Sequence, residues 1–316
     1  MNFFIQTIKA LERIVPRPLK RIFAVCMARV AYYFMHTHKL IALHNLSRSF
    51  PDKSTDELLQ IIKETYANFA LTFVEFPSIV RLNKKNIHRH VTVKGLEHYE
   101  NALREGRGIL LFTAHFGNWE FGNAALAILS QAPYFMARRL DSPFLEEFST
   151  SLRRVLGIGN LHKANAMRMV LPLLRKGEAV ILLIDQNVAA REGVFIDFFG
   201  RPACATTGVA LMAMHTGAAV LPVFTTRMQN GTYLTEIGPQ VETVKTGNRD
   251  KDLLTNTQSY NKIIEDHVRK YPGQWLWLHR RWKTRPVQAR KHTHFSQAAR
   301  PAREALLQLL DHPHVR

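Results

Sequence analysis

Residues 114–120, with the sequence AHFGNWE, contain the side chains best suited to chemistry. An imidazole, His115, and a carboxylate, Glu120, lie five positions apart, and a compact apolar run at residues 109–113 comes directly before them. In α/β folds the loops that follow the carboxyl ends of strands carry the active site. If a helix begins just after His115, Glu120 can hydrogen-bond one ring nitrogen, which fixes the tautomer and raises the basicity of the other nitrogen. The spacing predicts that His115 is a general base and Glu120 its partner; the alternative is a histidine that only caps the helix.

The other charged candidates follow predicted strands or lie on a predicted helix. Arg138 comes directly after an apolar run, and a guanidinium there can bind a phosphate or polarise a thioester oxygen. Asp185 ends another apolar run and can orient an arginine or cap a turn. Arg153 and Arg154 lie on a predicted helix. For the arginines the alternative is an exposed surface charge, and for Asp185 a structural role.

The sequence lacks the signatures of a covalent or nucleotide-dependent mechanism. It has no G-x-S-x-G, no G-x-x-x-x-G-K, and no G-x-G-x-x-G after the first predicted strand, and neither Cys26 nor Cys204 has the context of a nucleophile. Direct attack of a hydroxyl on an activated acyl donor needs only a base, an oxyanion stabiliser and two binding sites. The amide of Asn118 or the backbone N–H of Gly117 is a candidate oxyanion donor. We expect no cofactor.

The elements that position these residues alternate along the chain. We predict an α/β fold with a central, mostly parallel sheet and flanking helices, because short apolar runs alternate with segments of helical periodicity. The predicted strands are residues 91–93, 109–113, 134–137, 180–184, 219–225, 233–237 and 275–278. The predicted helices are residues 3–45, 54–73 with Ser54 or Thr55 as N-cap, 97–105, 121–129, 165–176, 209–216 and 256–269.

The apolar and basic residues of the N-terminal region indicate contact with a membrane. Its most apolar stretch, residues 22–35, is interrupted by Arg29 and is shorter than the roughly 20 apolar residues that span a bilayer. We favour an interfacial helix or a marginal single anchor over the alternative, a buried helix of a soluble domain. The predicted organisation is an N-terminal membrane-associating helical segment (1–45), a catalytic domain (46–286) and a basic, partly disordered tail (287–316).

Composition limits the class of partner. The 316 residues carry 43 Lys and Arg against 25 Asp and Glu, a net charge of +18, and 46% of them are hydrophobic, which excludes disorder of the whole chain. Residues 1–40 hold seven basic groups against one acid, and residues 280–316 hold nine against two. Basic ends on a nearly balanced body favour an anionic lipid surface, and we expect no nucleic acid. Two isolated cysteines indicate a reducing compartment, and the H-x-H pairs lack a third ligand, so we expect no metal.

His115 and Glu120 resemble the H-x-x-x-x-[DE] motif of the glycerolipid (lysophospholipid-type) acyltransferase superfamily. More specifically, the chain resembles the late (lauroyl and myristoyl) acyltransferases of bacterial lipid A synthesis over roughly residues 5–286. Further matches are Ala137-Arg138, Asp185-Gln186, residues 198–207 and 261–265, and the run WLWLHRRWKTRP at residues 275–286.

The resemblance implies transfer of a fatty acyl group from acyl carrier protein to a hydroxyl of a lipid A precursor, which forms an acyloxyacyl group. It implies the cytoplasmic face of the inner membrane, with anionic membrane lipids as neighbours. It implies that His115 is the base and Glu120 its partner. The positions that match the family's substrate-side residues and strand-end acid are Arg138, one of Arg153 and Arg154, and Asp185. Arg280 and Arg281 belong to a basic cluster around Trp282 that suits lipid phosphates, the acidic surface of a carrier protein or a nucleic-acid backbone, and the resemblance favours the first two.

Two other functions stay open at this point. One is acyl transfer to a lysophospholipid or another glycolipid, with acyl-CoA as a possible donor. The more remote one is a non-enzymatic basic protein that binds a membrane or nucleic acid. The position of His115 between a predicted strand and a predicted helix argues against the remote alternative.

Overall fold

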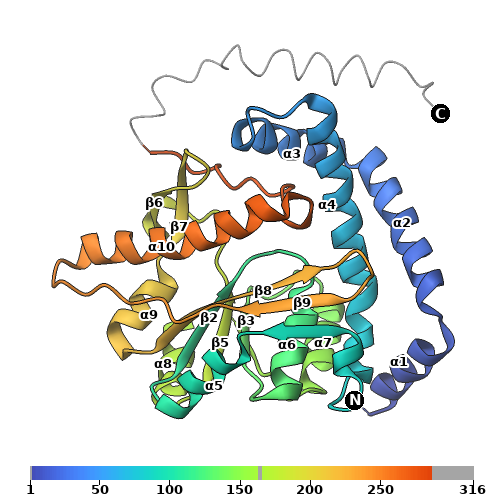
Figure 1. The fold of residues 1–316 in the computed structure, drawn as a ribbon, viewed down its shortest axis with the longest axis horizontal. Coiled ribbons are helices and arrows are strands. Elements are labelled where there is room, and N and C mark those ends of the chain that lie inside the picture. The colour runs from blue at the N-terminus through green and yellow to red at the C-terminus, as the bar shows by residue number, and fades with distance from the viewer. Residues whose placement is uncertain (1, 163–165, 287–316) are drawn as a thin grey trace.

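The computed structural model describes residues 2–162 and 166–286, and within them a mixed sheet forms the centre of the molecule (Figure 1). Its seven strands lie in the order β1-β9-β8-β2-β5-β3-β4. Neighbouring strands are parallel except β8 and β9, which are antiparallel. The predicted α/β class with a mostly parallel sheet is therefore confirmed. The strands are β1 (Val91–Lys94), β2 (Ile109–Thr113), β3 (Tyr134–Ala137), β4 (Asn160–His162), β5 (Ala179–Leu183), β8 (Ala219–Arg227) and β9 (Tyr233–Ile237).

Helices cover both faces of this sheet, because alternate residues of its buried strands point to opposite sides. On β2, Ile109 and Leu111 belong to one hydrophobic cluster, which includes Tyr99 and Leu126 of the helices on that face. Leu110 and Phe112 belong to the other large cluster. The helices that follow the first strand are α5 (Leu96–Glu105), α6 (Trp119–Leu129), α7 (Pro143–Arg154), α8 (Ala166–Arg175), α9 (Gly208–Thr216) and α10 (Arg249–Lys270).

The prediction of a strand at residues 275–278 is wrong. Trp275 forms only an isolated antiparallel bridge with Phe116, and the chain then turns. Trp275 and Trp277 are both fully buried, and their rings contact each other edge to face. The apolar run therefore reflects aromatic packing under a loop rather than strand pairing.

Three strands were not predicted: β4, β6 (Gly193–Asp197) and β7 (Pro202–Thr206). β6 and β7 form a separate antiparallel hairpin, and β6 packs against α10. The turn between them contains Phe199 and Gly200 at φ values of 56° and 70°. These segments are only three to five residues long, and the apolar run of β6 is just three residues, Val194 to Ile196, so each is too short to stand out in the sequence.

The N-terminal segment predicted as helical, residues 3–45, is divided into three helices. They are α1 (Asn2–Ile14), α2 (Arg17–Phe34) and α3 (His36–Ser49). Pro16 separates the first two, since proline suits the start of a helix but not its interior. On α3, Ala42, Leu43 and Leu46 are buried, and they belong to the same hydrophobic cluster as Leu110 and Phe112 of β2.

Helix α4 (Thr55–Glu75) begins at the predicted N-cap. The Ser54 side chain accepts from the N–H of Glu57, and the Glu57 carboxylate accepts from the N–H of Ser54, which completes a capping box. The apolar side chains along one side of α4 are buried from Leu58 to Tyr66, but Phe73, at the end of the predicted helix, is 59% exposed. Figure 1 shows α4 running along one side of the sheet with α2 outside it.

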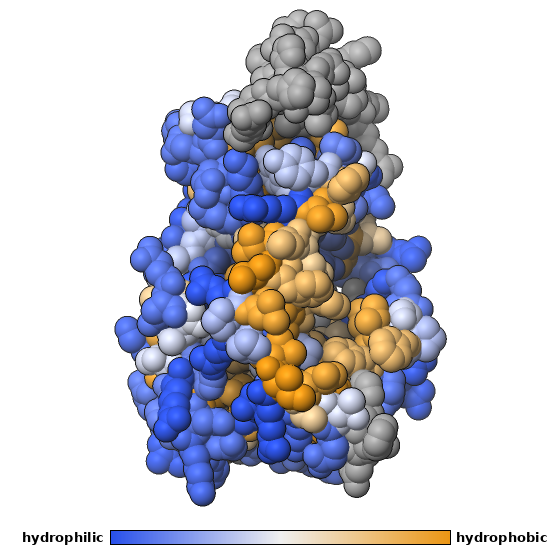
Figure 2. Space-filling model, turned by 90° about the vertical axis from the view of Figure 1, so that its right-hand side faces the viewer, coloured by the Kyte–Doolittle hydropathy of each residue, from blue (hydrophilic) through white to orange (hydrophobic). Residues whose placement is uncertain are grey.

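The outer side of α2 is apolar and exposed. Figure 2 shows a continuous hydrophobic strip on this face of the molecule. Ala24 and Ala28 are buried on the inner side of α2, whereas Ile22, Phe23, Val30 and Phe34 are 57–78% exposed. Among the described helices, none is both long and apolar enough to cross a membrane.

Candidate active site

The register of two parallel strands brings His115 next to Asp185. β2 and β5 pair from Ile109 with Ala179 to Thr113 with Leu183, so both strands end at the same edge of the sheet. His115 and Asp185 each lie two residues beyond the end of their strand. His115 Nδ1 is 2.9 Å from Asp185 Oδ1, and the backbone N–H of His115 donates to Oδ2 at 3.0 Å.

Asp185 is only 2% exposed, yet its surroundings favour the carboxylate form. Burial by itself raises the pKa of Asp185, but the His115 imidazole, both hydrogen bonds from His115 and the indole N–H of Trp275 at 2.8 Å outweigh it and hold that pKa below its usual range. Because a carboxylate can only accept, Nδ1 of His115 carries a proton, and in the neutral ring the lone pair is therefore on Nε2.

The other side of the His115 ring is open to a substrate. The side chain is 24% exposed, and the nearest hydrogen-bonding group at Nε2 is the Gln186 side-chain nitrogen at 3.4 Å. The Trp119 ring contacts the imidazole edge to face, with 5.6 Å between the centroids. A carboxylate behind the ring and an accessible Nε2 in front form the arrangement of a general base.

The predicted contact between His115 and Glu120 is wrong. The Glu120 carboxylate accepts from Arg153 Nε at 3.0 Å and from Arg153 Nη2 at 2.5 Å, and it also accepts from the Trp119 indole at 3.0 Å. Glu120 belongs to the first turn of α6 and is 4% exposed, on the side of the helix that packs toward α7. In the described residues Trp119 lies between the two, because its indole donates to Glu120 and its ring contacts the imidazole of His115.

Arg153, predicted to bind substrate, is instead part of the interior. Its guanidinium lies over the rings of Phe135 and Phe76, at 4.2 and 5.4 Å from their centroids, and donates to Asn160 Oδ1 at 3.0 Å. These contacts and the ion pair with Glu120 use the fork of donors on the guanidinium, so Arg153 joins α7 to α6 and the edge of the sheet. The structure thus corrects the prediction for Arg153.

Arg138 and Arg154 are both exposed. Arg138 forms an ion pair with Asp141 at 3.0 Å, and the two side chains are 74% and 86% exposed. In the described residues Arg138 contacts Asp141 rather than His115 or Asp185. The predicted roles of Arg138 and Arg154 in substrate binding stay predictions.

The loop after His115 does not offer the predicted oxyanion donors. The Asn118 side chain is buried, caps α6 by accepting from Phe121 N–H, and donates to the Tyr233 hydroxyl at 3.1 Å. The Gly117 N–H donates to the carbonyl of Gln274 at 2.9 Å. Gly117 has φ +54°, and a Cβ there would lie 1.8 Å from the Thr225 carbonyl oxygen, so this position requires glycine.

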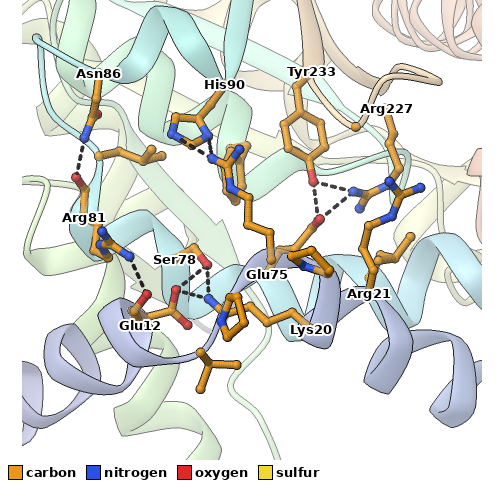
Figure 3. Close-up of a pocket in the computed structure, with 18 of the residues that line it drawn as sticks. Glu12, Lys20, Arg21, Glu75, Ser78, Arg81, Asn86, His90, Arg227 and Tyr233 are labelled. Atoms are coloured by element: carbon orange, nitrogen blue, oxygen red, sulfur yellow. Dashed lines mark hydrogen bonds and ion pairs between the residues drawn. The ribbon is translucent and has the colours of Figure 1, made fainter.

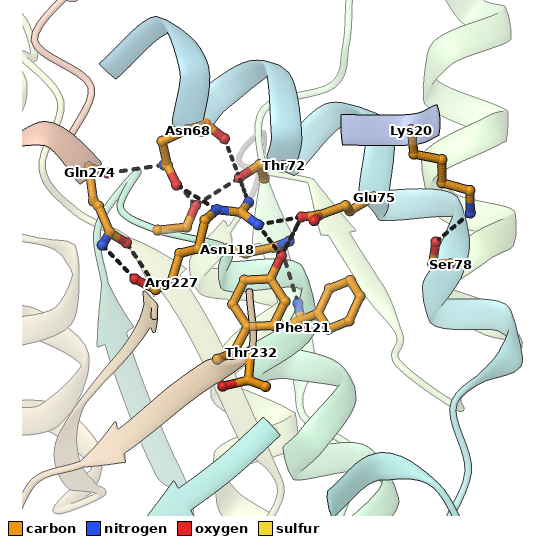
Figure 4. Close-up of polar contacts among 12 residues, drawn as sticks. Lys20, Asn68, Thr72, Glu75, Ser78, Asn118, Phe121, Arg227, Thr232 and Gln274 are labelled. Atoms are coloured by element: carbon orange, nitrogen blue, oxygen red, sulfur yellow. Dashed lines mark hydrogen bonds and ion pairs between the residues drawn. The ribbon is translucent and has the colours of Figure 1, made fainter. Parts of the chain in front are cut away.

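A polar network missed by the sequence analysis holds this loop in place (Figure 4). Arg227 Nη1 donates to Glu75 at 2.6 Å, and the Tyr233 hydroxyl bonds the same carboxylate. Asn68 donates to the carbonyl of Gly117 at 3.2 Å. These residues come from α4, β8 and β9, and no local motif connects them, so only the fold reveals the network.

The predicted phosphate-binding role of Arg281 is wrong. Arg281 is fully buried, donates to the carbonyl of Cys204 at 2.7 Å and to Asn261 Oδ1 at 3.2 Å, and lies over the ring of Phe198. Burial lowers the pKa of its guanidinium to about 10. Arg281 therefore joins β7 to α10, whereas Arg280 is exposed and its predicted contact stays a prediction.

Comparison with known proteins finds relatives that match most of the chain. The family model described as bacterial lipid A biosynthesis acyltransferase matches residues 2–284. The lipid A biosynthesis palmitoleoyltransferase of Escherichia coli (strain K12) is 28% identical over 275 residues, which cover 86% of this chain and 88% of that protein. The lipid A biosynthesis lauroyltransferase of the same strain is 27% identical over 263 residues, 82% of this chain and 84% of that one. A phosphatidylinositol mannoside acyltransferase of Mycobacterium tuberculosis (strain ATCC 25618 / H37Rv) is 25% identical over 237 residues, 73% and 72% of the two chains.

Proposed function

The chain belongs to the bacterial lipid A biosynthesis acyltransferase family, and we propose that it moves a fatty acyl chain from the thioester of acyl carrier protein to a hydroxyl of a lipid A precursor. The product is an acyloxyacyl group. The observation that carries the proposal is His115, with Nδ1 bonded to the buried Asp185 and Nε2 accessible at the end of two parallel strands. No cofactor takes part in the proposed step.

In the proposed mechanism His115 Nε2 removes the proton from the acceptor hydroxyl while the hydroxyl oxygen attacks the carbonyl carbon of the thioester. Asp185 stabilises the imidazolium that forms, because its carboxylate accepts from Nδ1–H. The carbon–oxygen bond forms, the carbon–sulfur bond breaks, and the imidazolium returns the proton to the leaving thiolate. The Gln186 side-chain amide lies beside Nε2 and is the donor that we assign to the developing oxyanion.

The test is an assay of purified protein with acyl carrier protein thioesters and with acyl-CoA of the same chain length. Acceptors are a lipid A precursor, a lysophospholipid and a phosphatidylinositol mannoside. We expect mass spectrometry to show the lipid A precursor heavier by one acyl group, with acyl carrier protein as the preferred donor. An equal or higher rate on one of the other two acceptors would favour the alternative function, and equal use of acyl-CoA would contradict the proposed donor.

We also propose that the protein works at the cytoplasmic face of the inner membrane and contacts the bilayer through the exposed apolar side of α2. Six large apolar side chains on this helix are more than half exposed, and basic residues lie among them in the sequence. Apolar surface of this kind on an amphipathic helix supports binding in the plane of the interface, and anionic lipids strengthen such binding.

Replacing Phe23 with glutamate should weaken the binding of the protein to anionic vesicles about tenfold or more, since a buried phenylalanine contributes roughly 1.5–3 kcal/mol. Flotation of the full chain with phosphatidylglycerol-containing vesicles measures this. Leu254→Glu is the matched control, because Leu254 is an exposed apolar residue of α10, 42% exposed. Equal weakening by both variants would contradict the assignment of α2 as the contact surface.

A further inference from the structure

A cavity of about 600 Å³ lies between the α1–α2 junction, the end of α4 and the β8–β9 hairpin (Figure 3). His115, Asp185 and Gln186 do not line it, and the mechanism above does not use it. Its charged lining is strongly unbalanced. Two carboxylates, Glu12 and Glu75, face six cations: Arg13, Arg17, Lys20, Arg21, Arg81 and Arg227.

Both carboxylates of the cavity are already neutralised by neighbours. Glu12 is paired with Lys20 and hydrogen-bonded to Ser78. Glu75 is paired with Arg227 at 2.6 Å. In contrast, within residues 2–162 and 166–286 no carboxylate forms an ion pair with Arg13, Arg17 or Arg21. The cavity therefore keeps three cationic groups available for an anion.

His90 also lines the cavity, and its surroundings are positively charged. Its Nε2 lies 2.9 Å from Arg17 Nη2, so the ring acts as a neutral acceptor for the guanidinium. Burial, together with the charges of Arg17, Arg81 and Arg89, lowers the pKa of His90 to about 4. A cation would be repelled here, whereas an anion would gain hydrogen bonds from exposed guanidinium groups.

The shape and the rim of the cavity indicate the kind of anion. Its volume is within the range of small-molecule sites, and it is concave, which suits a head group better than the convex surface of a protein. Next to its basic residues on α1 and α2 lie Ile14, Leu19, Ile22 and Phe23, which are 53–74% exposed. A positively charged cavity with exposed apolar side chains at its edge suits an amphiphile that has an anionic head group and an apolar tail.

We propose that this cavity binds the phosphate-bearing head group of a lipid whose acyl chains lie along the exposed apolar side of α2. Arg17 and Arg21 contact the phosphate, since both line the cavity and Arg21 also reaches the hairpin at Gly231. Arginine suits this role because its planar fork of donors matches phosphate oxygens.

The cavity is connected to the active-site loop. Tyr233 and Glu75 line it, and both contact the side chain of Asn118, three residues after His115. The lipid is either the phosphorylated acceptor or a phospholipid of the bilayer. The first of these sources rests on the proposed function, whereas the second does not.

The test compares Arg17→Ala/Arg21→Ala with the control Arg29→Ala/Lys63→Ala, which removes the same charge from exposed positions on α2 and α4 outside the cavity. The first arm is flotation of the full chain with phosphatidylcholine vesicles with and without phosphatidic acid. The second is the KM for a phosphorylated lipid A precursor and for the same lipid after removal of its phosphates.

If the lipid is a phospholipid of the bilayer, we expect Arg17→Ala/Arg21→Ala to reduce about tenfold the ratio of binding to vesicles with and without phosphatidic acid. The control variant should keep the ratio of the unmodified protein. A phosphorylated acceptor predicts a KM about tenfold higher for the phosphorylated precursor only, again with no such change in the control. Equal behaviour of the two double variants in both arms would overturn the proposal. The vesicle arm needs no turnover, so failure of the proposed acyl transfer leaves this inference testable.

Discussion

Replacing His115 with asparagine should lower kcat for acyl transfer by about two to four orders of magnitude, the usual contribution of a general base. The asparagine amide can donate to Asp185 from nearly the position of the lost Nδ1–H, so the buried carboxylate keeps a partner. What the variant lacks is a group in place of Nε2, the atom that faces the open side of the site. The measurement is the initial rate with saturating donor and acceptor.

Two observations make this result specific to the base. The midpoint of urea unfolding should stay close to that of the unmodified protein, because His115 is partly exposed and its backbone N–H still donates to Asp185. The KM values should change much less than kcat, since the missing group acts on the proton in the transition state. Near-normal turnover in a folded His115→Asn protein would contradict the assignment of the base.

The predicted position of His115, just after a buried strand, is confirmed, but the predicted partner carboxylate is wrong, and the reason is geometric. Thr113 and Ile184 are the last residues of two predicted strands, and the side chains that follow two parallel strands meet only if those strands are neighbours in the sheet. The strand order places β5 directly beside β2, and a single sequence does not reveal that order. The five-residue spacing to Glu120 was the only local signal, and in the structure Glu120 lies in the first turn of α6 and is paired with Arg153.

The arginines show the same limit. Arg281 and Arg153 are predicted to bind substrate from their charge and their position in the sequence. In the structure both are buried, and their partners come from distant parts of the chain. Arginine in a pattern of aromatic residues predicts an exposed cluster or a buried stack equally well, because its guanidinium packs on aromatic faces in both cases. In contrast, the bounds of the strands β2, β3 and β9 agree with the prediction. Each is a short, mostly apolar run next to polar, proline or glycine residues, so the sequence itself marks where the strand begins and ends.

Replacing Glu120 with glutamine should destabilise the fold rather than remove catalysis. The change leaves the buried Arg153 without its negative partner, and breaking a buried ion pair in this way costs about 3–5 kcal/mol. The glutamine oxygen still accepts from the Trp119 indole, so the ring against His115 is kept. We expect a clear fall in the urea midpoint, with kcat of the folded fraction reduced much less than in His115→Asn.

The surface pair of Arg138 and Asp141 provides the matched control, because it is also an arginine–carboxylate pair but more than 70% exposed. Asp141→Asn should change the free energy of unfolding by less than about 1 kcal/mol. The variant Glu120→Gln/Arg153→Met should recover much of the lost stability, since methionine can fill the space between Phe76 and Phe135 without a buried charge. If Glu120→Gln instead kept its stability and lost kcat by as much as His115→Asn, Glu120 would take part in the chemistry, and the role of Asp185 as the partner of His115 would need revision.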